Sequence, residues 1–67
     1  MYEVEIRNFV NDCNVQIAYL VVLRCNGKLK YMHAYSTLLS RSLALNRAYW
    51  KAQRLAGKYN CNITCDF

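Results

Sequence analysis

Apolar positions recur with the period of an α-helix over Thr37–Ala56. The members of this apolar stripe are Leu38, Leu45, Ala48, Tyr49, Ala52, Leu55 and Ala56. Ser36 or Thr37 offers a hydroxyl for an N-cap, and Gly57 stands where a left-handed residue would close the last turn. The pattern therefore predicts one amphipathic helix whose apolar stripe faces a core.

Four other segments have the pattern of β-strands. Tyr2–Phe9 and Cys61–Phe67 alternate apolar and polar residues, as a half-buried strand does. Val15–Cys25 is apolar at nearly every position, which is typical of a central strand, and Lys28–Tyr35 follows it. The asparagines of Asn8–Asn14 favour a turn between the first two strands. The order β-β-β-α-β predicts an α+β fold, with one amphipathic helix packed on one face of a small, mostly antiparallel sheet.

The Asn26-Gly27 pair predicts a hairpin, and the length of its loop decides which residues share a face. A two-residue turn would set Val22 opposite Tyr31 and place lysines on the apolar face. A three-residue loop with Gly27 in a left-handed bulge position would set Val21 opposite Tyr31. We predict the second loop, because it gathers the apolar residues on the helix side. The gathered residues would be Val15, Ile17, Tyr19, Val21, Leu23, Leu29, Tyr31 and Tyr35.

The opposite face of this hairpin would carry a second apolar patch with a basic rim. Its residues are Ala18, Leu20, Val22 and Met32, framed by Arg24, Lys28 and Lys30. A chain with a single helix has nothing obvious to cover this patch, and exposed apolar patches rimmed by charge usually mark contact sites. We therefore expect it to serve as the face of a homodimer.

The last strand is expected to run parallel to the strand before the helix, through a right-handed crossover. Such a crossover can skip a strand, which would pair the last strand antiparallel with Val15–Cys25. The alternation predicts that Cys61, Ile63, Cys65 and Phe67 face inward.

The chain length predicts a single domain, residues 1–67. A domain of this size buries only about 60% of the surface of its unfolded chain, so a partner would add stability. The longest apolar run, Ile17–Leu23, is far too short to span a bilayer, and the start MYEVEIRN does not resemble a signal peptide. We therefore expect a cytoplasmic protein without membrane contact.

Side chains that could carry chemistry do not form a recognisable motif. Cytosolic cysteines stay reduced, and the default expectation is that the four here are free, buried thiols. Cys61 and Cys65 would lie about 13 Å apart on one strand face, too far for a disulfide or one shared zinc ion. His33, opposite Tyr19 in the predicted register, could pair with a cysteine, but a strand histidine packed beside tyrosines is the simpler interpretation. We predict no enzymatic activity, no metal and no cofactor.

Charge is the most informative property of the composition. The net charge is +5, and it comes from five basic residues in the helical region. They are Arg41, Arg47, Lys51, Arg54 and Lys58, and no acidic residue occurs from Leu38 to Lys58. On a helical projection the last four fall opposite the apolar stripe. A helix face without a single acid-base pair forgoes stabilisation, which suggests that it is directed at a negatively charged partner.

Trp50 falls outside the apolar stripe, near Leu39 and Leu43 and beside arginines. A strand or loop could cover it. The alternative is a partner-facing ridge, since aromatic residues and arginine are enriched at interface hot spots. The predicted partner-binding residues are Trp50, Arg47, Lys51, Arg54, Lys58, Leu39 and Leu43. The same face could bind nucleic acid, with Trp50 stacking on a base.

In its architecture the chain resembles small phage-encoded proteins that inhibit host factors. The hairpin around Asn26-Gly27, the segment Tyr35-Ser36-Thr37 before one helix, and the final strand with Cys61-Asn62-Ile63-Thr64-Cys65 carry this resemblance. It implies an inhibitor or adaptor that acts in the host cytoplasm without catalysis. Its target would be a host protein of nucleic-acid processing or defence, and direct nucleic-acid binding is the alternative.

Overall fold

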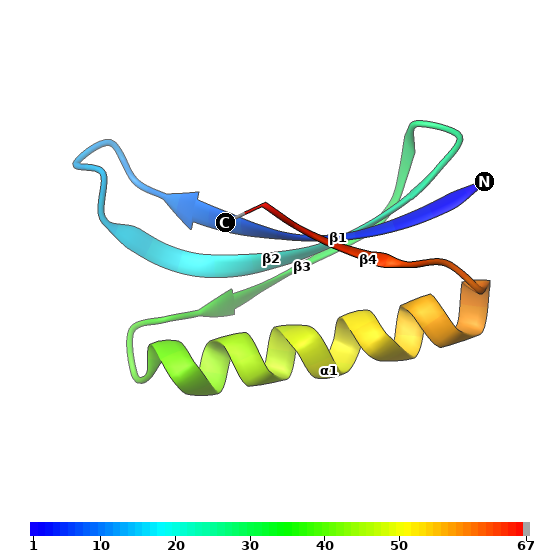
Figure 1. The fold of residues 1–67 in the computed structure, drawn as a ribbon. Coiled ribbons are helices and arrows are strands. Elements are labelled where there is room, and N and C mark those ends of the chain that lie inside the picture. The colour runs from blue at the N-terminus through cyan, green and yellow to red at the C-terminus, as the bar shows by residue number, and fades with distance from the viewer. Residues whose placement is uncertain (67) are drawn as a thin grey trace.

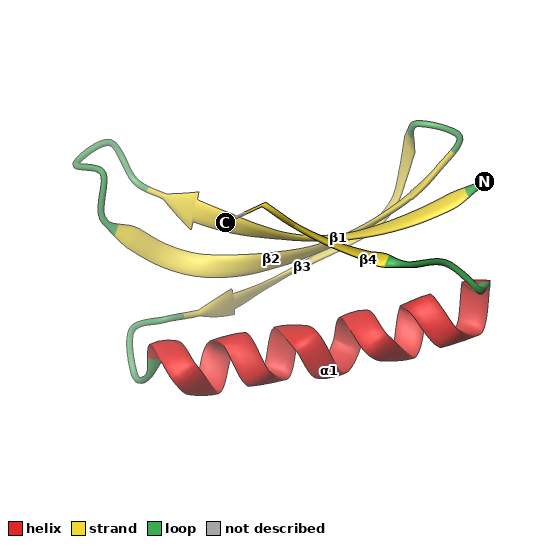
Figure 2. Ribbon diagram, viewed as in Figure 1, coloured by secondary structure: helices red, strands yellow, loops and turns green. Residues whose placement is uncertain are grey.

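The computed structural model describes residues 1–66, which form four strands and one helix in the order β-β-β-α-β (Figures 1 and 2). The elements are β1 (Tyr2–Val10), β2 (Gln16–Cys25), β3 (Lys28–Ser36), α1 (Arg41–Tyr59) and β4 (Ile63–Asp66). The helix lies along one face of the sheet (Figure 1). The α+β fold predicted from the pattern is confirmed, and Phe67, expected to face inward, lies outside the described residues.

The four strands form one mixed sheet in the order β3-β2-β1-β4. β2 pairs antiparallel with β1 and with β3, and β4 pairs parallel with β1. The last strand thus runs parallel to β3, as expected, but the suggested antiparallel pairing with the central strand is wrong. Both edges of β2 are already occupied, so that the open edge of β1 is the one left for β4. The connection through α1 therefore joins the two edges of the sheet.

The β2–β3 hairpin corrects the predicted loop. Asn26 and Gly27 both have positive φ angles, 55° and 82°, and form a two-residue turn that sets Cys25 opposite Lys28. A β-bulge lies farther along the hairpin. Arg24 faces Leu29, but Leu23 faces Tyr31, so that Lys30 is the extra residue of the bulge.

This displaced bulge restores the alternation that the three-residue loop was meant to provide. Tyr31 and Tyr35 face the helix as predicted, because the extra residue shifts the register by one. Leu29 precedes the bulge, lies opposite Arg24 on the other face and is exposed, so its predicted core position is wrong. His33 faces Val21 instead of Tyr19, and its ring contacts that of Tyr35.

The helix begins four residues later than predicted, with Ser40 as the N-cap. The Ser40 hydroxyl accepts a hydrogen bond from the Leu43 N–H at 3.2 Å. The earlier candidates serve the preceding strand, because the Thr37 N–H donates to Ile17 and the Ser36 hydroxyl accepts from Leu38. Leu38 consequently lies before the helix with 83% of its surface exposed and does not belong to the core.

The helix also ends later, at Tyr59. Gly57 is an internal helical residue, and the left-handed C-cap is Asn60, with a φ angle of 55°. Asparagine tolerates this conformation better than other residues with a Cβ, which explains why it can replace the expected glycine.

The core lies between α1 and the central strands. Ala44, Ala48 and Ala52 face the sheet, and these small side chains allow the helix to approach it closely. Beneath them the fully buried side chains are Val4, Ile6 and Val21 of β1 and β2.

The turn between β1 and β2 starts later than predicted, because β1 continues to Val10. The Asn11 side chain then accepts hydrogen bonds from the N–H groups of Cys13 and Val15.

Candidate partner interface on α1 and β3

Trp50 lies on the outer surface of α1 with 59% of its side chain exposed. The Arg54 guanidinium lies 4.8 Å from the ring centroid, a cation–π contact that holds both side chains on the surface. Leu43, two turns before Trp50 on the same side of the helix, is also exposed. The structure thus answers the question about Trp50: no strand or loop of residues 1–66 covers it.

The basic residues lie on one flank of α1, and their predicted position opposite the core is wrong. The Lys51 ammonium lies 5.2 Å from the ring centroid of Tyr31 on β3. The opposite flank faces β4, where the Tyr49 hydroxyl lies 3.1 Å from the Cys65 sulfur. The helical projection gave the spacing correctly, but the centre of the buried face was shifted, because Ala44 is buried although the predicted stripe did not include it.

Arg47 lies on the same flank, near Tyr35. Burial raises the pKa of the Tyr35 phenol, the negative charge of a Tyr31 phenolate would raise it further, and the Arg47 charge opposes both effects. Farther along the helix, Arg54 and Lys58 are exposed, and the Lys58 ammonium lies 5.4 Å from the Tyr59 ring centroid. Through Arg47 and Lys51, the basic flank of α1 therefore lies beside the outer strand β3.

A pocket of about 340 Å³ opens where β3 leads into α1. Its lining consists of Tyr35, Ser36, Leu38, Leu39, Ser40, Leu43, Ala44 and Arg47. Leu39, expected on the helical ridge, lies in the preceding loop and is almost completely exposed. Because the helix begins only at Arg41, Leu39 and Leu43 line an apolar hollow next to the Arg47 guanidinium group instead of forming a helical ridge.

Paired charges and unpaired basic charges lie on different sides of the molecule. Glu5 on β1 lies 3.2 Å from Arg24 of β2 and 3.5 Å from Arg7, which in turn lies 3.5 Å from Asp66 of β4. These side chains lie on the sheet face away from the helix. The seven basic residues of β3 and α1 form no ion pair with any of residues 1–66. The net positive charge is therefore concentrated on the side formed by β3 and α1.

The patch expected to form a dimer is smaller than predicted. Val22 is only 3% exposed, because it lies between Met32 of β3 and Glu5 of β1. Ala18 is also buried. Leu20 is half-buried, whereas Met32 is 56% exposed. Lys28 and Lys30 are exposed at the hairpin end, but Lys28 lies opposite Cys25 on the helix side of the sheet and Lys30 is the bulge residue, so the predicted place of Lys28 on the rim of this face is wrong. The exposed apolar surface of this face therefore lies toward the β3 edge.

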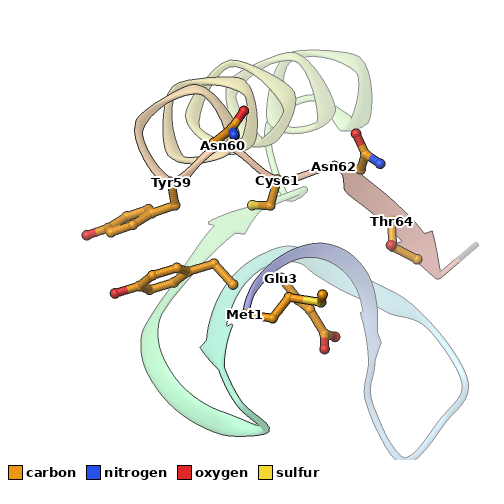
Figure 3. A pocket seen from close by; sticks show the side chains of 8 residues that line it. Met1, Glu3, Tyr59, Asn60, Cys61, Asn62 and Thr64 are labelled. Carbon is orange, nitrogen blue, oxygen red and sulfur yellow. The ribbon is translucent and has the colours of Figure 1, made fainter.

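A second pocket, of about 620 Å³, lies at the other end of the helix (Figure 3). Its lining consists of Met1, Tyr2, Glu3, Tyr59, Asn60, Cys61, Asn62 and Thr64. The Tyr2 and Tyr59 rings stack with centroids 4.3 Å apart, and the charge of a Cys25 thiolate raises the pKa of the Tyr2 phenol. Sequence reasoning missed this pocket, because it depends on the parallel pairing of β4 with β1.

The groups with chemical reactivity are dispersed. All four cysteines are free, but Cys13 and Cys65 are exposed, so the expectation that all are buried is wrong. Cys61 precedes β4, and the strand itself begins only at Ile63. Within residues 1–66, no three side chains of His, Cys, Asp or Glu come together in a way that could hold a metal ion. The helix among these residues lacks the apolar length needed to cross a membrane.

Comparison of the chain with models of protein families, with curated proteins and with solved structures gives no match.

Proposed function

We propose that this protein is a non-enzymatic binding protein that docks on an acidic surface of another protein through α1 and the adjoining edge of the sheet. The observation that carries this proposal is the combination of exposed Trp50 and Leu43 with basic residues that have no acidic partner within residues 1–66. The resemblance to phage-encoded inhibitors fits the same role. On that reading the partner is a host protein of nucleic-acid processing or defence.

Physical arguments favour a protein partner for this surface. Interface hot spots combine buried aromatic anchors and arginine with a rim that excludes water, and Trp50 with Arg54 supplies such a pair. A field of one sign accelerates association with an oppositely charged protein. The apolar hollow beside Arg47 can receive an aliphatic side chain, which a nucleic acid does not provide.

The test is affinity capture of partners from a nuclease-treated lysate of the host cell, with mass spectrometry of the eluate. A protein should be retained in stoichiometric amount, and a Trp50→Ala, Arg54→Glu variant should lose it. A Phe9→Ala, Asn8→Asp variant is the control, since it truncates an exposed aromatic side chain and adds negative charge on β1, outside α1 and β3. The control should retain the partner.

Two results would overturn the proposal. One is a loss of every partner on nuclease treatment. The other is a Trp50→Ala variant whose free energy of unfolding falls by about 3 kcal/mol, as expected for a buried aromatic residue, since Trp50 would then serve the core.

Direct nucleic-acid binding is the second candidate, and one observation favours it. Aromatic and basic side chains alternate across α1 and β3, with Lys51 over Tyr31 and Arg54 over Trp50. Such surfaces bind single strands by stacking and phosphate contacts. The test is fluorescence anisotropy of a labelled oligothymidine across a salt series. With four phosphate contacts, the slope of log K against log salt would be about −2.8, and absence of binding at low salt would exclude this candidate.

A further inference from the structure

The outer edge of β3 has backbone groups that no strand of the described chain uses. The Thr37 N–H donates to the Ile17 carbonyl at 3.0 Å, which places this pair among the hydrogen-bonded pairs of the β2–β3 ladder. Because hydrogen-bonded residues alternate in antiparallel strands, Met32, Ala34 and Ser36 direct their N–H and C=O groups away from β2. β3 ends the sheet, so among residues 1–66 nothing pairs with this side.

The two halves of this edge differ in how they are protected from strand pairing. Natural edge strands are commonly protected by lysines and bulges. Lys28, Lys30 and the bulge provide this protection at the hairpin end, whereas residues 31–36, YMHAYS, contain no lysine, arginine, proline or bulge. The opposite edge strand, β4, has only four residues. One uncharged stretch of edge backbone is therefore open.

The basic flank of α1 lies next to this open stretch. Lys51 contacts Tyr31, and Arg47 lines the same pocket as Tyr35. Residues four apart on a helix are separated by about 6 Å along its axis. Alternate residues of an extended strand are separated by about 6.7 Å. Acidic side chains at every second position of an added strand would therefore match the spacing of Arg47 and Lys51.

The other face of the added strand would meet a different environment. Met32 and Ala34 are exposed on the sheet face away from the helix, so that the remaining positions of the strand would gain apolar contacts. At the Ser36 end, the hollow beside Leu43 opens on the helix side. An aliphatic side chain of the added strand could enter it.

We infer that β3 accepts an extended acidic segment of a protein partner as a fifth strand. Acidic side chains of this segment alternate with apolar ones, the acidic side chains face Arg47 and Lys51, and an aliphatic residue occupies the hollow at the start of α1. This inference rests on the proposed function and specifies the form of its partner. A second copy of the chain fits poorly, because β3-to-β3 pairing would bring two basic flanks together and neither β3 nor α1 carries an acid. A nucleic acid does not present the alternating N–H and C=O groups that the edge would pair with.

The test uses the capped peptide Leu-Val-Glu-Val-Glu-Val-Glu and NMR spectroscopy of the labelled protein. In an antiparallel arrangement its leucine reaches the hollow and its glutamates face the basic flank. Binding should slow hydrogen exchange of the Met32, Ala34 and Ser36 amides at least tenfold and shift the Lys51 side-chain signals. Two control peptides carry the same charge: Leu-Val-Val-Val-Glu-Glu-Glu, which lacks alternation, and the original peptide with N-methyl groups on the edge that faces β3. Neither should bind.

A substitution at Ala34 separates backbone pairing from charge attraction. Ala34→Pro removes an outward N–H without removing a hydrogen bond of the β2–β3 ladder, since proline is tolerated at such edge positions. It should abolish peptide binding, whereas Ala34→Ser should preserve it. If Ala34→Pro also disturbs the fold, as judged by the amide spectrum of β1, the N-methylated peptide with the unaltered protein decides the question.

Strand addition would be overturned if the N-methylated peptide binds, or if the non-alternating peptide binds as tightly as the original. It would also be overturned if hydrogen exchange at Met32, Ala34 and Ser36 does not change, or if oligothymidine displaces the peptide and protects the same amides. The proposed function can survive such a result. A captured protein partner that is lost with Trp50→Ala, Arg54→Glu but retained with Ala34→Pro would refute the fifth strand alone. Failure to capture a nuclease-resistant protein partner would refute the proposed function itself.

Discussion

Charged side chains have different roles on the two sides of this molecule. Across β2, β1 and β4, Arg24, Glu5, Arg7 and Asp66 follow one another in contact and sum to no net charge. Across β3 and α1, seven basic residues form no ion pair within residues 1–66, and three of them contact aromatic rings. The first group neutralises itself within the fold. The second leaves its charge uncompensated on the surface.

This difference indicates where stability and where binding should reside. Paired charges on the crowded sheet face help to cover Val22, which is buried although no helix lies over it. The basic flank of α1 carries mutual repulsion, and a single acid in the helix would have relieved it. A substitution should therefore affect mainly the fold on the first side and mainly the interaction on the second.

The largest effect is expected where both sides depend on the same core. Ile6 is fully buried beneath α1, so that Ile6→Ala should lower the free energy of unfolding by about 3 kcal/mol. Because the domain is small, Trp50 fluorescence and the circular dichroism of the sheet should be lost at the same urea concentration. Separate transitions would show that the two sides do not share one cooperative core.

The second effect concerns the paired side. Glu5→Gln removes the carboxylate that contacts both Arg24 and Arg7, and it should lower the free energy of unfolding by about 1 kcal/mol, because these groups are partly exposed. Arg47→Gln is the matched control on the basic side and should change it by less than about 0.5 kcal/mol. Equal losses in urea denaturation would remove the distinction between the two sides.

How much of this contrast is present in the sequence depends on the range of the interactions involved. Alternation and helical periodicity depend on neighbouring residues, and they predicted all five elements and the fold class. The hairpin register and the late start of the helix depended on competition between alternative local hydrogen bonds. Ser36 and Thr37 could cap the helix or end the strand. The Thr37 N–H donates to the Ile17 carbonyl and so continues the ladder with β2, and the Ser36 hydroxyl accepts from the Leu38 N–H in the loop, so neither residue caps the helix.

The candidate site shows the same limit. The position of Trp50 outside the apolar stripe could be inferred, because it depends on one element, whereas its exposure stayed open until the structure showed that no strand or loop of residues 1–66 covers it. The flank occupied by Arg47 and Lys51 could not be inferred, since it depends on where α1 lies across the sheet. The open edge of β3 and the pocket between Tyr2 and Tyr59 require the strand order, which no local pattern contains.

A third, smaller effect separates stability from binding on the basic side. Arg47→Glu places an acid four residues before Lys51, an orientation that stabilises helices by about 0.2 to 0.5 kcal/mol. The free energy of unfolding should therefore rise slightly, while the affinity for an acidic partner falls at least tenfold. Thermal denaturation and peptide titration measure the two quantities on one sample. A variant that is less stable and still binds would show that the positive charge of Arg47 serves the fold.

The smallest effect is expected in the titration of two tyrosines, one on each flank of α1. The hydrogen bond to Cys65 is the main cause that raises the pKa of Tyr49, whereas burial is the main cause that raises the pKa of Tyr35, against the opposing charge of Arg47. Cys65→Ala should therefore move the pKa of Tyr49 down toward its ordinary value, and Arg47→Gln should move the pKa of Tyr35 farther up.

The sign of the stability effect follows from proton binding. Both phenols hold their protons more tightly in the folded than in the unfolded chain. Their contribution to stability is therefore complete below the unfolded pKa of about 10 and is lost as the pH rises through the folded values. The pH dependence of the tyrosine ring carbon signals in NMR spectra reports each residue separately. A Tyr49 pKa that does not change in Cys65→Ala would mean that the sulfur contact does not form in solution, and the junction between α1 and β4 would then need another explanation.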